Sequence, residues 1–127
     1  MVVFGAPLSA EDDTERALNT AIEMQKKIKE LNNNRKKRRA KPVLVGAGIN
    51  KGFVVSGNIG SRDMMDYTVI GDTVNLGSRL CSAAGPGEII VSKEVTKNQD
   101  KHFNFEELVP INVKGKKDKI NIFKVNY

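Results

Sequence analysis

The sequence has very few residues of the types used for disulfides and metal clusters. Among its 127 residues there is one cysteine, one histidine and no tryptophan. Cys81 alone cannot close an intramolecular disulfide, so nothing in the sequence requires an oxidising compartment. With His102 as the only histidine, we expect no Ser/His/Asp triad and no histidine-based metal cluster. We interpret Cys81 as a core residue and His102 as a surface or half-buried residue.

Long apolar runs are also absent. No run approaches the roughly 18 residues that a membrane-spanning helix needs, and the N-terminus lacks the regions of a signal peptide. Hydrophobic residues make up 39% of the chain and charged residues 28%, which is typical of a soluble globular protein. A chain of this length supplies one domain that buries roughly two-thirds of its unfolded surface. The sequence therefore predicts one compact domain in a cytoplasmic setting.

The positive charge is concentrated in one short stretch, from Arg35 to Lys41. It holds six of the 21 basic residues and no acid, so the remaining 15 basic residues balance the 15 acids. Two interpretations stay open for it, a solvated loop and an electrostatic docking site for an anionic surface. Nucleic-acid binding is disfavoured, because no aromatic residues for base stacking are interleaved with these charges.

Hydrophobic periodicity predicts a mixed α and β chain. Helices are predicted over 9–31, with Ser9 or Asp13 as the N-cap, and over 73–84, with a further turn or two over 93–99. Asn32 to Asn34 should end the first helix, and Gly85-Pro86-Gly87 the second. Strands are predicted at 1–6, 42–49, 53–59, 67–70, 88–92, 103–113 and 120–125. This order indicates an α+β or α/β fold with a mixed sheet.

Glycines recur through the two β-rich runs between residues 42 and 59. Glycine within strands marks a bulge or a close approach of the backbone to a ligand. A dinucleotide-binding loop needs G-x-G-x-x-G opening a helix, whereas Gly46, Gly48 and Gly52 are spaced G-x-G-x-x-x-G with strands on both sides. The spacing therefore excludes the dinucleotide interpretation.

The segment from Tyr67 to Leu80 is the strongest candidate for a binding site. Asn75 and Arg79 lie four residues apart near the start of a predicted helix, so both project from one face close to its positive end. This arrangement suits phosphate binding, although the same pair also fits an ordinary helix surface. Thr68, at the end of the preceding strand, could bond a ligand or the neighbouring backbone.

These residues resemble a known family. The strings MDYTVIGDTVNLGSRL, MVVFGAP, GAGINKGFVVSGNIGS, PGEIIVS and VKGKKDKINIFKV are similar, in order, to the class III adenylate and guanylate cyclase catalytic domain. The resemblance implies an α+β, ferredoxin-like cyclase fold with a mixed sheet and flanking helices. It also implies conversion of a nucleoside triphosphate to its 3′,5′-cyclic monophosphate and pyrophosphate. The ribose 3′-oxygen attacks the α-phosphorus, two Mg²⁺ ions (or Mn²⁺) assist, and the sites form between the chains of a head-to-tail dimer.

The resemblance also assigns roles to single residues. It implies that Asn75 orients the ribose and that Arg79 stabilises charge developing on the α-phosphate. Lys114 matches the lysine that holds the triphosphate, and Arg62 lies near a position that contacts phosphate in some members. The Thr68 side chain and the Val69 backbone match the purine-reading position. Threonine there is typical of a subgroup of adenylate cyclases associated with bicarbonate responsiveness, which favours ATP over GTP.

The chain departs from the family pattern at its metal sites. The family holds its metals with two aspartates from its first strand and from the hairpin ahead of the segment that matches 1–6. We therefore expect an N-terminally truncated domain over 1–127, without the family's first strand, next two helices and second strand. We expect it to bind no metal and to be inactive alone, with an unpaired sheet edge or an exposed apolar face that seeks a second copy or a complete cyclase chain.

Two alternatives belong to other functional classes. One is a catalytically dead cyclase-like module that dimerises with an intact partner and regulates it. The other is a basic interaction module that binds an anionic polymer through 35–41.

Overall fold

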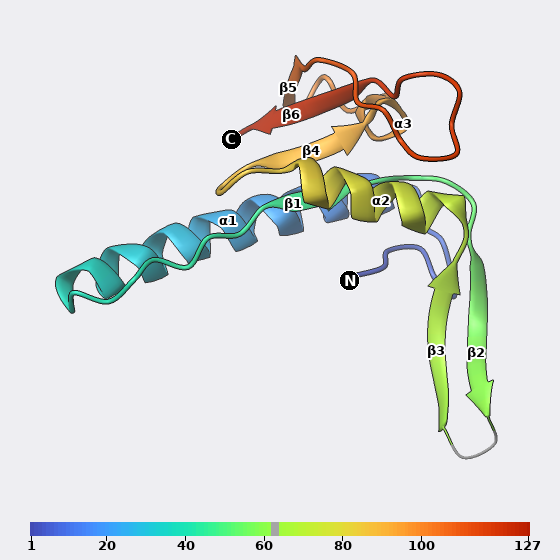
Figure 1. Ribbon diagram of the computed structural model, residues 1–127, viewed down its shortest axis with the longest axis horizontal. Coiled ribbons are helices and arrows are strands. Elements are labelled where there is room, and N and C mark those ends of the chain that lie inside the picture. The colour runs from blue at the N-terminus through green and yellow to red at the C-terminus, as the bar shows by residue number, and fades with distance from the viewer. Residues whose placement is uncertain (62–63) are drawn as a thin grey trace.

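The computed structural model describes residues 1–61 and 64–127, with side chains described outside 59–68. In chain order the elements are α1 (Asp13–Lys37), β1 (Ala47–Ile49), β2 (Val55–Ser61), β3 (Met64–Ile70), α2 (Asp72–Ala83), β4 (Ile89–Ser92), α3 (Lys93–Thr96), β5 (Asn104–Glu107) and β6 (Ile122–Asn126). One sheet has the strand order β1-β4-β6-β5, and β2 and β3 form a separate antiparallel hairpin (Figure 1). The β1–β4 pair is parallel and the other two pairs are antiparallel, so the predicted mixed sheet is confirmed.

The central strand β4 is buried on both faces because α1 and α2 cover opposite sides of the sheet. Successive side chains of a strand point to opposite faces. Ile89 and Val91 accordingly pack with Leu18 of α1, whereas Ile90 packs with Leu80 of α2. These five side chains are at most 1% exposed. The uninterrupted apolar run in β4 follows from this double coverage.

Two glycines allow α2 to lie directly on β1. A Cβ atom at Gly48 would sit 2.1 Å from the amide nitrogen of Cys81, and one at Gly46 would sit 2.5 Å from the carbonyl oxygen of Ala84. The sequence predicts a bulge or a close approach to a ligand at these glycines, whereas the structure shows a close approach to another part of the chain. The approaching group is the backbone of α2, which any larger side chain would push away.

The first helix begins and ends later than predicted, and Asp12 is its N-cap instead of Ser9 or Asp13. It continues through Asn32 to Asn34 and ends at Lys37, so part of the basic stretch is helical and not a loop. The Asn32 side-chain amide donates to the Val43 carbonyl oxygen at 2.8 Å, and the Val43 N–H donates to Asn32 Oδ1 at 2.7 Å. This tertiary contact offsets the low helix propensity of asparagine.

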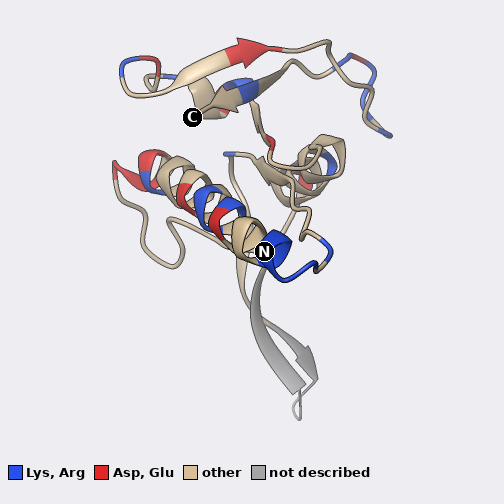
Figure 2. Cartoon of the chain, turned by 90° about the vertical axis from the view of Figure 1, so that its left-hand side faces the viewer, with Lys and Arg blue, Asp and Glu red and all other residues tan. Residues whose placement is uncertain are grey.

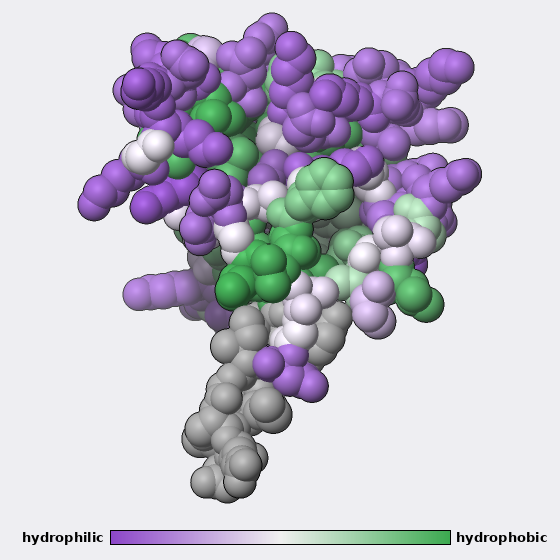
Figure 3. All heavy atoms as spheres, turned by 90° about the vertical axis from the view of Figure 1, so that its right-hand side faces the viewer, coloured by the Kyte–Doolittle hydropathy of each residue, from purple (hydrophilic) through white to green (hydrophobic). Residues whose placement is uncertain are grey.

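Apolar side chains remain exposed around the hairpin and the first residues of the chain. Within the described residues, β1 pairs only with β4 and leaves its other edge open. Residues 1–6 form no strand there, contrary to prediction, and Cys81 is exposed instead of buried. Figure 3 shows apolar side chains gathered beside the base of the hairpin. Among all the described side chains, the large hydrophobic residues that are at least 65% exposed are Met1, Val2, Leu8, Leu44, Phe53, Val55 and Val109.

The turn between α2 and β4 is held by Glu88. Its Oε2 accepts the Gly85 N–H at 2.8 Å, and its Oε1 lies 3.1 Å from Lys124 Nζ of β6. The Gly85 hydrogen bond, followed by the Lys124 contact, lowers the pKa of Glu88 from its ordinary value of 4.5. A carboxyl with a lowered folded-state pKa contributes stability above its unfolded pKa and loses it as pH falls through the folded pKa.

Replacing Glu88 by glutamine should therefore flatten the acid limb of the stability profile. The wild-type chain should lose stability as pH falls below 4.5, and Glu88→Gln should start lower at neutral pH and lose less. Urea unfolding midpoints across this range measure both slopes. Glu107→Gln is the matched control, because the Glu107 side chain is exposed on β5, makes no described hydrogen bond or ion pair, and lies opposite Phe123 and not Lys124 in the β5–β6 register. Equal acid losses in wild type and Glu88→Gln would contradict this role.

Candidate functional site

The site begins where β3 runs into α2. Gly71, with φ of 133°, joins the two elements, and its carbonyl oxygen accepts the N–H groups of Val74 and Asn75 at 3.1 and 3.2 Å. A positive φ of this kind favours glycine. The amide groups of the first turn of α2 consequently lie directly after the strand that carries Thr68. The predicted strand-to-helix connection is confirmed.

Asn75 and Arg79 both lie on α2 and both are exposed. Residues four apart on a helix share a face. The neighbouring face of α2, about 100° around the helix, is anchored by Leu80, which is fully buried, and by Leu76, which packs against the same cluster. The core therefore fixes which way the helix is turned and leaves Asn75 and Arg79 open to solvent.

The purine-reading candidates lie in β3. Thr68 pairs with Gly57 and Val69 with Ser56 in the hairpin register. Val69 as a whole residue is 6% exposed, so little of it is open to solvent in the single chain. The Thr68 side chain and the whole of Arg62 lie outside the described residues.

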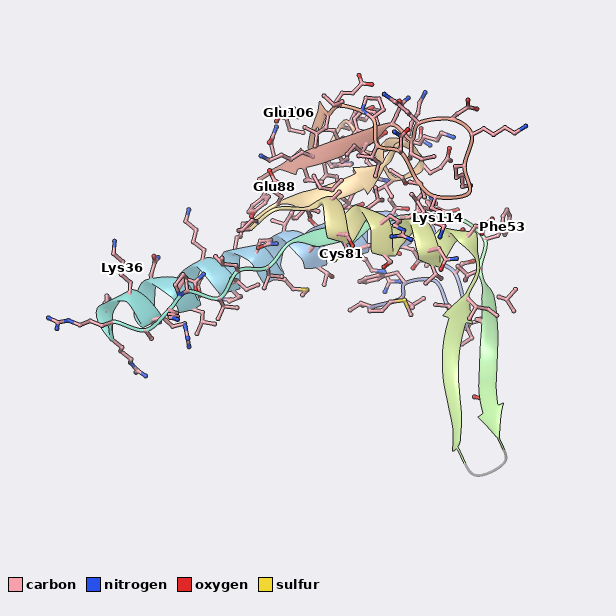
Figure 4. All side chains as sticks on the ribbon, viewed as in Figure 1. Lys36, Phe53, Cys81, Glu88, Glu106 and Lys114 are labelled. Atoms are coloured by element: carbon pink, nitrogen blue, oxygen red, sulfur yellow. The ribbon has the colours of Figure 1, made fainter. Side chains whose placement is uncertain are left out.

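Lys114 lies on the loop that precedes β6 and is exposed. The Lys116 N–H donates to the Val113 carbonyl oxygen at 3.0 Å, and Gly115 has φ of 86°, so the loop reverses tightly at this point. Figure 4 shows Lys114 at the end of the molecule where α2 begins. Among the described hydrogen bonds and ion pairs, none joins Lys114 to Asn75 or Arg79. A single chain thus presents these three side chains without closing a site around them.

A cavity of about 340 Å³ lies between the start of α2, the end of β4 and the loop ahead of β6. The Oγ of Ser92, a residue that is 4% exposed, is buried there without a described hydrogen-bond partner. Asn50 donates from Nδ2 to the Thr73 carbonyl oxygen at 2.9 Å, which fixes one wall. The charged residues in the lining are Lys51, Lys93, Lys116, Lys119, Asp72 and Glu94.

The sequence did not predict this cavity. Its lysines come from three separate segments, and only the KGKKDK run after Val113 indicated a local excess of positive charge. Four lysines against two acids give it a positive balance, which favours anions. It adjoins the loop of Lys114, whereas Asn75 and Arg79 are not in its lining.

The described acidic side chains form no cluster of metal ligands. In the part of the chain that the structure describes, no group of three or more His, Cys, Asp or Glu residues could hold a metal ion. Mg²⁺ binds through carboxylate oxygens together with substrate phosphates. We therefore assign no chemical step in this chain to a metal. A separate finding is that none of the described helices is both long and apolar enough to cross a membrane.

Comparison with known proteins decides the family. The family model for the adenylate and guanylate cyclase catalytic domain matches residues 1–126. The chain belongs to this family. The adenylate cyclase of Mycobacterium tuberculosis strain H37Rv is 38% identical to it over 116 residues, which are 91% of this chain and 25% of that protein. The rat guanylate cyclase soluble subunit beta-2 is 33% identical over 117 residues, which are 91% of this chain and 17% of that protein.

Solved cyclase domains show the same fold. The adenylyl cyclase CyaB from P. aeruginosa matches with a TM-score of 0.91 and 35% identity, over 98% of this chain and 65% of that one. The guanylyl cyclase Cya2 matches with a TM-score of 0.87 and 36% identity, over 96% of this chain and 62% of that one. The predicted α+β cyclase fold is thereby confirmed. The chain spans about a quarter of the curated adenylate cyclases and just under two thirds of these solved domains.

Proposed function

We propose that this chain forms part of a catalytic domain that converts ATP to 3′,5′-cyclic AMP and pyrophosphate. The observation that carries the proposal is the exposed pair Asn75 and Arg79 on α2, directly after the strand of Thr68, in a chain of the cyclase family. Asn75 orients the ribose, and Arg79 stabilises the charge that develops on the α-phosphate. The relatives support both nucleotides, since adenylate and guanylate cyclases are among them.

The remaining residues bind the nucleotide. Lys114 holds the triphosphate, and the lysines around the neighbouring cavity raise the local concentration of polyphosphate by their positive field. Thr68 and the Val69 backbone read the purine edge, and Arg62 contacts phosphate. No described contact joins Asn75, Arg79 and Lys114 within one chain, and in this proposal a second chain completes the site.

The cations belong to the complete domain in this proposal. The family resemblance implies Mg²⁺ or Mn²⁺, which neutralises phosphate charge when bound. The described acids form no site for it. We propose that the ligands of the cation come from the part of a complete cyclase domain that this chain does not match.

Nucleotide preference tests the adenylate assignment. The test protein is a chimera in which the part of CyaB outside the match is joined ahead of Met1 of this chain. We expect it to use ATP with a higher kcat/KM than GTP. Thr68→Val should reduce that preference by about fivefold, because losing one neutral hydrogen bond costs on the order of 1 kcal/mol.

Thr68→Ser provides the control, because it keeps the hydroxyl and should keep the preference. Initial rates with each nucleotide, read as cyclic product, give the two kcat/KM values. A higher kcat/KM for GTP in the unmodified chimera would overturn the adenylate assignment and leave the family membership intact.

A second candidate function is a non-catalytic partner of a complete cyclase. Three observations favour it: the open edge of β1, the exposed apolar residues near it, and acids that fit no metal. One of the solved structures to which the chain is similar is a non-canonical dimeric guanylyl cyclase domain.

Both candidates predict association. An open strand edge beside exposed apolar side chains should pair with another copy, through the edge or by exchange of an element. Sedimentation velocity at micromolar concentration should show dimers or larger species. A stable monomer under these conditions would contradict association through this edge.

A further inference from the structure

The C-terminal end of α1 carries the whole net charge of the chain. We call the residues Arg35, Lys36, Lys37, Arg38, Arg39 and Lys41 the basic tip. No acid occurs between Glu30 and Asp63, and none of the described ion pairs involves a residue of the tip. Figure 2 shows the Lys and Arg colour gathered where α1 ends. Figure 1 shows that α1 extends beyond the sheet there, so the charge is held away from the rest of the domain.

Hydrogen bonds hold the tip in one arrangement. Arg39 has φ of 55°, and the Ala40 N–H donates to the Arg35 carbonyl oxygen at 2.9 Å. Arg35 Nε in turn donates to the Lys41 carbonyl oxygen at 2.7 Å. The Asn32–Val43 pair closes the base of this turn. Arg35 is thus engaged in the turn, whereas the other five basic side chains are exposed.

The fold explains only part of this charge. Cations in the last turn of a helix interact favourably with its dipole, but the effect fades beyond that turn. Arg38, Arg39 and Lys41 lie past the end of α1 and repel the lysines before them. None of the described ion pairs compensates these three exposed charges, and a partner of opposite charge would offset their repulsion.

The tip also borders a cavity that two of its cations, Lys36 and Arg39, help to line. It has a volume of about 430 Å³ and is lined by Asn32, Asn33, Lys36, Arg39, Ala40 and Pro42. Ammonium, guanidinium and amide groups are the donors that bind phosphate oxygens. A headgroup phosphate could enter it from solvent.

Neighbouring side chains distinguish a lipid surface from a nucleic acid. No aromatic residue occurs between Phe4 and Phe53, so the tip has no stacking platform for bases. Leu31 is 46% exposed and lies one helical turn before Arg35. Leu44 is 66% exposed and directly follows Val43, which is hydrogen-bonded to Asn32. Basic residues beside exposed aliphatic side chains suit the interface of an anionic membrane.

We propose that the basic tip docks this domain on a membrane surface rich in anionic phospholipid. The five exposed cations face the anionic headgroups, and Leu31 and Leu44 contact the boundary of the acyl chains. Docking is peripheral, consistent with the finding that none of the described helices could cross a membrane. The proposal needs no nucleotide and is independent of the catalytic role proposed above.

Vesicle co-sedimentation of the 127-residue chain tests the proposal. We expect binding to vesicles of phosphatidylcholine with phosphatidylserine, a loss of binding at high salt, and little binding to phosphatidylcholine alone. Lys36→Gln with Lys37→Gln should weaken binding about 30-fold, since each basic residue near an anionic surface contributes about fivefold. Both glutamines keep the helix propensity of α1, and circular dichroism checks this.

Lys101→Gln with Lys117→Gln is the matched control. It removes the same charge from exposed positions outside the basic tip and outside both cavities, on the segment between α3 and β5 and on the loop ahead of β6 (Figure 1). Its binding should change by less than about threefold, because charges further from the surface than a Debye length are screened. Equal weakening by the two double variants, equal binding to neutral vesicles, or tighter binding to DNA or RNA than to anionic vesicles at the same salt would overturn the proposal.

Discussion

Replacing Arg79 by alanine in the chimeric domain is expected to lower kcat by roughly 100-fold to 1000-fold with little change in KM. Arg79 is exposed on α2, and none of the described hydrogen bonds or ion pairs uses its guanidinium. A group that meets charge developing on the α-phosphate binds the transition state more strongly than ATP. Removing the Arg79 side chain should therefore lower kcat and leave KM nearly unchanged.

Stability measurements separate this role from a structural one. The orientation of α2 depends on Leu80 and Leu76, so Arg79→Ala should change the free energy of unfolding by less than about 0.5 kcal/mol. Asn75→Ala should behave in the same way. Ser78→Ala is the matched control, since it is an exposed position on the same helix with no proposed contact to substrate. Unchanged turnover with a lowered Tm in both Arg79→Ala and Asn75→Ala would show that this helix face is structural.

Local sequence predicted the elements whose periodicity and burial agree. The predicted bounds of α2 and β4 lie close to the observed ones. Both elements are marked by short-range sequence features, the apolar run 89–91 and the turn at Gly85. The end of α1 was not found, because the Asn32–Val43 contact joins residues 11 apart and overrides a local helix breaker. The apolar pattern of residues 1–6 predicts a strand, but these residues pair with none of the described strands although one edge of β1 is open.

In the candidate site too, features set by short-range sequence are predicted and features set by the tertiary fold are not. The shared face of Asn75 and Arg79 follows from helical spacing alone, so the sequence was sufficient. The cavity beside the Lys114 loop brings together residues 50–51, 72–76, 92–94 and 116–121, which only the tertiary fold places side by side. The exposure of Cys81 has the same cause, because Gly48 brings β1 onto the backbone of α2 and leaves the Cys81 side chain at the surface.

The 127-residue chain alone is expected to produce no cyclic AMP above background from ATP with Mg²⁺ or Mn²⁺. Asn75, Arg79 and Lys114 share no described contact, and no described group of acids could hold the cations. Joining the CyaB portion ahead of Met1 should restore turnover, because we expect it to complete the sheet beside the open edge of β1 and to supply further site residues. The comparison measures cyclic AMP at equal protein concentration for the chain, the chimera and the chimera with Arg79→Ala. Only the unmodified chimera should be strongly active. Turnover by the chain alone that Arg79→Ala abolishes would show that this chain closes a working site without the added portion.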